Sequence, residues 1–267
     1  MAGKGINFSW HLHRSTIVAA LLRRPLAYLS WGVAYHRGLR RRIARMVLRA
    51  ADVVFVNDAR TADEVRAVAG VEARRLPYMV DTRFFCVAAQ ERENFLFCPG
   101  ANDRDGEVLV ALAQRGHRVV WLNNLPDLAQ RYTGLSPNLT IVSHPSFEAL
   151  RALYRSCAAV VQPLTRDIHA AGQTTTLEAL ASGAPVVLGS GRTAELFAEA
   201  GLVDVVSGSA GEAWSAVIVR ALARERGDRA LAATRAARIA RDHSFETVGD
   251  LLVESLARVR PASTRAR

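Results

Sequence analysis

The chain has 267 residues, which is enough for one large domain or two small ones. Hydrophobic residues make up 50% of it and charged residues 22%, a balance that is typical of globular proteins and excludes a largely disordered chain. The three cysteines, Cys86, Cys98 and Cys157, show no Cys-x-x-Cys spacing. Their number and spacing exclude a disulfide-built scaffold and argue against a structural zinc site.

The sequence contains no apolar stretch of the about 18 residues that a membrane-spanning helix needs. Residues 10–14 read Trp-His-Leu-His-Arg, which interrupts the region where a signal peptide would be apolar. We therefore expect a cytoplasmic protein with neither a transmembrane helix nor a signal peptide.

The net charge of +10 comes mainly from arginine. Basic residues gather in residues 37–49, in residues 220–241 and at the C-terminal tail. A basic surface can attract nucleic acid, anionic lipid or phosphorylated small molecules. A composition rich in Ala and Arg is explained equally well by the base composition of a genome, so the charge alone selects no function.

In chain order, the first predicted element is a very basic amphipathic helix at residues 39–50, which leads into a buried strand at 53–56. Residues 75–81 contain Pro77 and no clear hydrophobic period, which predicts a linker between domains.

Beyond this linker, short apolar runs rich in β-branched residues alternate with segments of helical length. The predicted strands cover residues 95–97, 119–122, 139–142, 159–161 and 185–188. The predicted helices cover residues 106–115, 147–156, 174–182, 194–200 and 245–259. Apolar strands separated by helices indicate βαβ units and a parallel sheet buried on both faces. Residues 84–240 are therefore predicted to form a Rossmann-like domain.

The segment at 171–187 carries the most chemical information. Gly172 and the small polar residues after it open a helix just beyond a strand and its loop. The free N–H groups of a first helical turn, with the helix dipole behind them, form an anion site that suits a diphosphate. One turn later, Glu178 offers a carboxylate that can accept hydrogen bonds from sugar hydroxyls. The alternative is a capped helix with a solvated glutamate.

Residues 178–187 read Glu-Ala-Leu-Ala-Ser-Gly-Ala-Pro-Val-Val. They resemble the Glu-Ala-(Met/Leu)-Ala-x-Gly-x-Pro-Val-Val motif of GT-B glycosyltransferases of the family 4 type (glycosyl transferases group 1). Further pieces similar to that family follow its order along about residues 28–258. They lie at residues 51–58, 76–85, 95–105, 150–163 and 245–258.

The resemblance implies an α/β fold of the GT-B type, with one complete Rossmann-like donor domain and a partial N-terminal α/β domain. The N-terminal, acceptor-side domain and its linker would cover residues 1–82, and the nucleotide-sugar donor domain residues 83–242. Residues 243–267 would form a helix that crosses back to the N-terminal domain, followed by a basic tail.

The resemblance also implies an activity, namely a retaining, hexosyltransferase-like transfer of sugar from a nucleotide diphosphate sugar to an acceptor. It implies no cofactor and no metal, because a helix terminus and basic side chains neutralise the leaving diphosphate.

Site residues carry over by position. Arg104 and Glu178 would be the catalytic residues, with Arg104 against the phosphates and Glu178 on the nucleotide ribose. The residues expected to bind the donor are Gly100, Ser143, His144, Gly172, Gln173, Thr174, Thr175 and Glu178. Of these, Ser143 and His144 would touch the nucleotide base largely through their backbone.

Three positions depart from the family pattern. The first glutamate of the family's Glu-x7-Glu motif is replaced by Ala170, and Asp167 or His169 could take its role. The first glycine loop has Ala101 and Asp105 where the family usually has Arg and Lys.

Only about 80 residues precede the linker, whereas a full domain of this kind has roughly 150. A late start codon, a lost segment or a completing partner chain would each explain the short N-terminal part. His36 is the candidate there for a contact near the reacting sugar.

Two other functions compete with glycosyl transfer. A degenerate donor domain would bind a nucleotide or a partner without catalysis. A nucleic-acid-binding module needs exposed aromatic residues among its basic ones or a known motif, and neither occurs, so no nucleic acid is expected. The basic helix at 39–50 is instead the candidate for peripheral contact with an anionic membrane at its inner face, and the acceptor would be a lipid-linked or cell-surface precursor.

Overall fold

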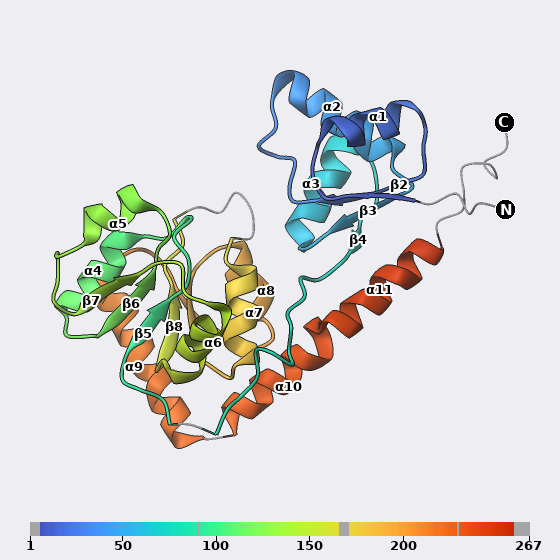
Figure 1. Cartoon of the computed structure of the whole chain (residues 1–267). Coiled ribbons are helices and arrows are strands. Elements are labelled where there is room, and N and C mark those ends of the chain that lie inside the picture. Colours follow the sequence, from blue (N-terminus) through green and yellow to red (C-terminus); the bar gives the residue numbers. More distant parts are fainter. Residues whose placement is uncertain (1–5, 90, 166–170, 229, 259–267) are drawn as a thin grey trace. The chain divides into compact units, whose positions relative to one another are not determined.

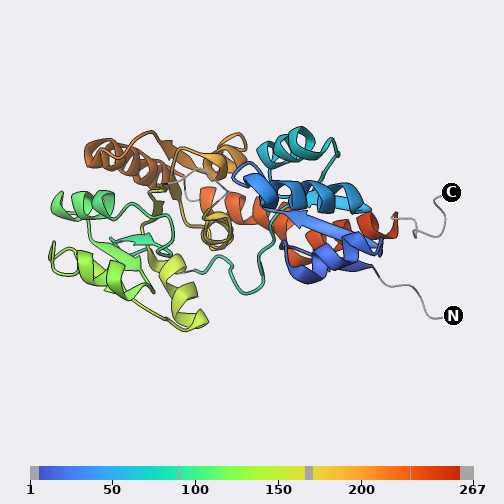
Figure 2. The same cartoon turned by 90° about the horizontal axis from the view of Figure 1, so that it is seen from above.

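The computed structural model describes residues 6–89, 91–165, 171–228 and 230–258 of the chain. The chain divides into two compact units. Figures 1 and 2 show the chain with colours that follow the sequence. Met1–Tyr78 and Glu246–Arg267 form the N-terminal unit, and Met79–Phe245 form the C-terminal unit.

The N-terminal unit contains a parallel sheet of four strands in the order β1-β2-β3-β4. Its elements are β1 (Asn7–Ser9), α1 (Arg14–Leu21), β2 (Leu26–Ser30), α2 (Gly38–Ala50), β3 (Val53–Val56), α3 (Ala59–Ala69), β4 (Arg74–Arg75) and α11 (Phe245–Ala257). Each strand pairs with the next along the chain, so right-handed crossovers put α1, α2 and α3 on one face of the sheet.

Alternate residues of the central strands point to opposite faces of this sheet. Tyr28 and Val54 pack against α1, α2 and α3, whereas Leu29 and Phe55 pack with Val248 of α11 on the other face. Figure 1 shows α11 on the side of the strands opposite to these three helices, and in Figure 2 the red helix runs beside the blue strands. Helix α11 therefore closes the core on this face of β2 and β3.

The C-terminal unit contains a parallel sheet of six strands in the order β10-β9-β8-β5-β6-β7. Its strands are β5 (Leu96–Cys98), β6 (Val119–Leu122), β7 (Leu139–Val142), β8 (Ala159–Gln162), β9 (Val186–Gly189) and β10 (Asp204–Val206). Its helices are α4 (Gly106–Gln114), α5 (Pro126–Tyr132), α6 (Phe147–Ser156), α7 (Gln173–Ala181), α8 (Arg192–Ala198), α9 (Gly211–Gly227) and α10 (Leu231–His243). This is the strand order of a doubly wound dinucleotide-binding fold, whose direction of winding reverses between β5 and β8.

Helices cover both faces of the six-stranded sheet. Residues of α4, α5 and α9 pack against one face, where Leu96 and Cys98 of β5 are buried. Phe97, which lies between them, points to the other face and meets the ring of Tyr154 on α6 at 5.2 Å between centroids. The prediction of a parallel, Rossmann-like sheet is therefore confirmed.

The bounds of several elements differ from the sequence prediction, and β1, α1, β2, α3, α5, β10, α9 and α10 were not predicted. Arg75, the first residue of the predicted linker, belongs to β4, and the N–H of Leu76 still donates to Val56 O of β3 at 2.8 Å. The predicted strands at 95–97 and 185–188 each begin and end one residue later. In the described part of the chain, no helix combines the length and the apolar character that a membrane span requires.

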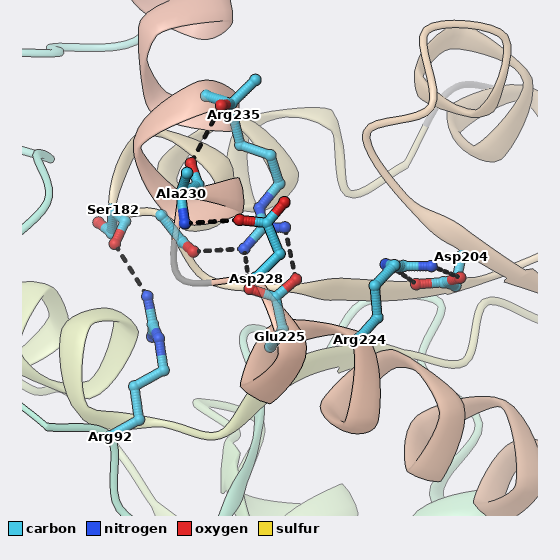
Figure 3. Close-up of polar contacts among 10 residues, drawn as sticks. Arg92, Ser182, Asp204, Arg224, Glu225, Asp228, Ala230 and Arg235 are labelled. Carbon is cyan, nitrogen blue, oxygen red and sulfur yellow. Dashed lines mark hydrogen bonds and ion pairs between the residues drawn. The ribbon is translucent and has the colours of Figure 1, made fainter.

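Two arginines hold the C-terminal end of α7. Arg92 donates to Ser182 O and, through Nη1, to the carbonyls of Tyr154, Arg155 and Cys157 at the end of α6. Arg235 of α10 donates to Gly183 O at 2.8 Å and pairs through both Nη atoms with Glu225 of α9 (Figure 3). These donors satisfy carbonyls that a helix end leaves without partners and complement the negative end of its dipole.

Replacement of Arg235 by Met tests this anchor. The Arg235 and Glu225 side chains are only 8% and 15% exposed, so the change leaves a buried carboxylate without its partner. We expect the free energy of unfolding of the C-terminal unit to fall by about 3–5 kcal/mol. Arg224→Met is the matched control, because the Arg224–Asp204 pair in the same view is 51% and 23% exposed. It should cost about 1 kcal/mol or less. Urea denaturation measures the free energy of unfolding of both variants. Equal losses would contradict the role of Arg235 as an anchor of α7.

Candidate functional site

The carboxyl ends of β5 and β8 lie side by side where the winding of the sheet reverses. In open α/β sheets this crevice is where ligands bind. The loop after β5 contains Gly100 and Arg104, and a bridge joins Arg104 to Leu164 in the loop after β8. Helix α7 begins after the second of these loops, with Gly172 as its N-cap.

Arg104 lies in the predicted loop, and protein groups accept from both of its Nη atoms, whereas its buried Nε has no hydrogen-bond partner among the described residues. The residue is 8% exposed, and its guanidinium donates to Pro99 O at 2.9 Å, to Asn102 O at 3.0 Å and to Gln162 Oε1 at 2.8 Å. Sequence analysis expected this cation to contact phosphate directly. The structure instead buries its guanidinium against the carbonyls of its own loop and Gln162.

Gln162 at the end of β8 is the centre of this network. Its Oε1 accepts from Arg104 and from Thr175 Oγ1 at 2.9 Å, and its Nε2 donates to Thr176 Oγ1 at 2.9 Å. The fully buried amide thereby fixes the first turn of α7 to the sheet. Sequence analysis missed Gln162, although a glutamine in an otherwise apolar buried strand is a signal that could have found it.

Gly172 has a backbone conformation that favours glycine and no room for a side chain. Its φ is +81°, and a Cβ at this position would lie 2.4 Å from Oε1 of Gln162. Thr175 Oγ1 also donates to Gly172 O at 3.0 Å. The helix start is therefore held in one conformation.

The first turn of α7 offers donors to the crevice. The first N–H groups of a helix have no partner within the helix. Thr174 is exposed, whereas Gln173 is buried, and the Nε2 of Gln173 has no hydrogen-bond partner among the described residues. An anion with several oxygens could accept from these groups.

A cavity of about 460 Å³ opens beside this turn. Thr174 and Glu178 of α7 contribute to its wall, together with Asp81 and with Glu148 of α6. Most of the remaining lining is apolar, with the phenylalanines Phe84, Phe85, Phe147 and Phe245. Such a cavity, largely apolar with a few polar groups, is typical of small-molecule sites.

Glu178 lies one turn into α7, as predicted, and is half-buried. Its Oε2 accepts a hydrogen bond from the hydroxyl of Tyr154 at 2.7 Å. Burial raises the pKa of the Glu178 carboxyl above its usual value, and the bond from Tyr154 opposes that rise. Sequence analysis did not single out Tyr154 as a site residue.

Three further predicted site residues lie outside the cavity wall. Gly100 has φ +84° and accepts from Trp121 Nε1 at 2.8 Å. Ser143 and His144 are exposed in the loop after β7, and the His144 N–H donates to Asn124 Oδ1. These two residues do not contribute to the wall of the cavity, although Phe147 and Glu148 follow them closely in the sequence.

His36 belongs to the N-terminal unit, where it follows β2. It is buried, its ring packs edge-on against Tyr35, and its Nδ1 has no hydrogen-bond partner among the described residues. Burial and the nearby Arg40 charge lower the pKa of His36. The imidazole is therefore neutral at neutral pH.

The alternatives for the missing glutamate, Asp167 and His169, and Ala170 itself lie outside the described residues. Within the described ranges, no group of three or more His, Cys, Asp or Glu side chains is arranged to hold a metal ion.

No family model matches the sequence, and no curated protein matches it. Solved structures match the fold. A sucrose-phosphate synthase from Thermosynechococcus elongatus has a TM-score of 0.75 and 18% identity, over 93% of this chain and 73% of the other. HepE of Anabaena, in complex with UDP and glucose, has a TM-score of 0.74 and 16% identity, over 91% of this chain and 74% of the other.

A glycosyltransferase from Rickettsia africae ESF-5 has a TM-score of 0.77 and 14% identity, over 98% of this chain and 77% of the other. These proteins are GT-B glycosyltransferases, and at such identities the likeness concerns the fold alone. The predicted fold class is confirmed: this chain has a GT-B fold, with parallel sheets in both units.

Replacement of Gly172 by Ala tests whether the start of α7 is rigid. Gly134 is a matched control, because its φ is also +81° but a Cβ there would meet nothing within 4 Å. Gly134→Ala should cost about 1–2 kcal/mol of stability for its left-handed backbone. Gly172→Ala should cost about 1–3 kcal/mol more, because Gln162 cannot move without breaking its bonds. Thermal unfolding compares the stability of the two variants. Equal losses would mean that the Gln162 side chain moves aside without loss of stability.

Proposed function

We propose that the protein is a glycosyltransferase of the family 4 type that transfers a sugar from a nucleotide diphosphate sugar to an acceptor. The observation that carries this proposal is the position of Glu178 and Thr174. Both contribute to the wall of one apolar cavity, directly beside the N-terminal turn of α7. The fold adds support, because HepE of Anabaena has been solved with UDP-glucose.

In this proposal the first turn of α7 receives the diphosphate. Its N–H groups and the positive end of the helix dipole stabilise the negative charge that develops as the sugar leaves. Gln173 Nε2 and the hydroxyl of Thr174 supply further donors. The buried charge of Arg104 acts through its field, since its Nη atoms donate to protein carbonyls and to Gln162. We propose a reaction that needs no metal ion and retains the configuration of the sugar.

The nucleoside would occupy the cavity. The phenylalanines provide flat apolar surfaces for a base, and the Glu178 carboxylate accepts hydrogen bonds from ribose hydroxyls. This recognition requires the ionised carboxylate. Affinity should therefore decrease as the pH falls through the raised pKa of Glu178.

A panel of UDP, GDP, dTDP and ADP, with their common sugars, tests the donor site by thermal unfolding. A nucleotide at a hundred times its Kd stabilises the native protein by about 2.7 kcal/mol. We expect one nucleotide to raise the Tm selectively and Glu178→Gln to weaken its binding about tenfold or more, because a charged acceptor is lost. Glu212→Gln, a change to an exposed residue of α9, is the control.

The outcome separates two functions. Selective binding with turnover of the nucleotide sugar supports the transferase. Selective binding without turnover would assign the chain to non-catalytic nucleotide binding. No binding of any nucleotide would contradict both.

The distribution of charge supports a membrane-bound acceptor. The first 51 residues contain ten Lys and Arg and no Asp or Glu, so they carry the whole net charge of +10. On α1, Arg14, Val18 and Leu21 are exposed at helical spacing, and Leu22 and Arg24 are exposed just after the helix. An apolar helix face flanked by arginines suits the surface of an anionic bilayer. We propose peripheral contact through α1, rather than through the basic helix at 39–50 that the sequence singled out, and a lipid-linked acceptor.

Co-sedimentation with vesicles tests this contact. Leu22→Ser combined with Arg24→Gln should weaken binding to phosphatidylglycerol-containing vesicles about tenfold, through the lost charge and the lost apolar area. Val219→Ser combined with Arg220→Gln on α9 removes the same kinds of exposed groups and should leave binding unchanged. Binding should also weaken with salt. Equal binding to pure phosphatidylcholine vesicles would contradict the proposal.

A further inference from the structure

The hydroxyl of Tyr154 has a fixed direction. Tyr154 is fully buried, and its ring meets Phe85 and Phe97 edge-on at 5.8 Å and 5.2 Å between centroids. Because the ring cannot turn away in this packing, its hydroxyl stays on Oε2 of Glu178 at 2.7 Å.

The backbones of the two residues are also tied to each other. Arg92 donates from one guanidinium to the carbonyl of Tyr154 itself and to Ser182 O, one turn beyond Glu178. Figure 3 shows the second of these bonds. The ends of α6 and α7 are thereby held together, and the distance between Tyr154 and Glu178 is fixed from the main chain as well as through the side chains.

Within the described part of the chain, one oxygen of Glu178 is engaged in a hydrogen bond. No hydrogen bond to Oε1 occurs among the residues that the structure describes, while Oε2 is held by Tyr154. Burial and the adjacent Glu178 raise the pKa of Tyr154 well above its usual value, so the phenol remains a donor at any working pH. The carboxylate is therefore kept as an acceptor with one defined free oxygen.

We propose that Tyr154 is a positioning residue for nucleotide recognition: it orients Glu178 so that Oε1 faces the cavity and accepts from a hydroxyl of the bound nucleoside. This inference rests on the proposed function, since it assigns a partner to Glu178 within the same site. It selects ligands that present a hydroxyl donor at that point, such as ribonucleotides, over analogues that lack one.

The surroundings of Glu178 make its pKa depend on the hydrogen bond from Tyr154. Asp81 and Glu148 contribute carboxylates to the same cavity wall. Burial raises the pKa of Glu178, and the hydrogen bond from Tyr154 is the interaction that lowers it. The Arg104 charge favours the ionised form of Tyr154, but burial and Glu178 outweigh it and raise the pKa of the phenol. Without the Tyr154 hydroxyl, the pKa of Glu178 should rise further, and the pH below which nucleotide affinity falls should move upward.

Tyr154→Phe tests the proposal, because it removes the hydroxyl and keeps the ring. Affinity is measured by calorimetry, below the Tm of each variant, for the nucleoside diphosphate that binds the wild type. We expect binding about tenfold weaker at neutral pH, with the affinity midpoint shifted to higher pH. If Oε1 accepts from the ribose 2′-hydroxyl, Tyr154→Phe should reduce the affinity for the 2′-deoxy nucleotide less than it reduces the affinity for the ribonucleotide.

Tyr132→Phe is a matched control. Tyr132 is also buried, and its hydroxyl also donates to a glutamate, Glu107 Oε1 at 3.1 Å. This variant removes an equivalent bond outside the cavity wall, so it should leave affinity and its pH dependence unchanged.

A double variant separates positioning from a general loss of structure. If Tyr154 acts through Glu178, then Tyr154→Phe in the Glu178→Gln background should cause little further loss of affinity. Additive losses would overturn the proposal, as would wild-type affinity and pH dependence in Tyr154→Phe while Glu178→Gln weakens binding. Wild-type affinity in Glu178→Gln would instead overturn the proposed donor site, and this inference with it.

Discussion

The helix α7 is anchored at both ends, and the site depends on this constraint. At its N-terminus, the buried amide of Gln162 binds Arg104, Thr175 and Thr176 and leaves room only for glycine at position 172. At its C-terminus, Arg92 and Arg235 satisfy the last carbonyls. A helix held in this way presents its first turn and Glu178 with little freedom, and such preorganisation is what electrostatic stabilisation requires.

The parts of the fold that follow from local pattern could be predicted from the sequence. Five buried strands of the C-terminal unit and the start of α7 were found within a residue, because apolar runs and a Gly–polar helix start are local signals. The helix α3 was missed, although Asp58 caps it and Gly70 ends it at φ +67°. Its alternation of Ala, Val and charged residues is a weaker signal than the strands around it.

The side-chain network of the site could not be predicted in the same way. Gln162 and Thr175 are 13 residues apart, and Tyr154 and Glu178 are 24 apart, so their contacts depend on how the sheet winds. Arg104 shows the same limit. Its position in the loop was predicted, but its burial among carbonyls comes from the packing of β5 against β8, which no local spacing encodes.

The position of α11 has a consequence for the order of events during synthesis. Leu29 and Phe55 leave the ribosome well before Val248, which covers them and lies 219 and 193 residues further along the sequence. Until then, this face of the N-terminal sheet is not covered by α11. Covering it costs the conformational entropy of closing a loop that contains all the residues between Phe55 and Val248. The C-terminal unit, whose core is contiguous in sequence, can fold first. In a nascent chain, the unit that begins the sequence is therefore the last to be finished.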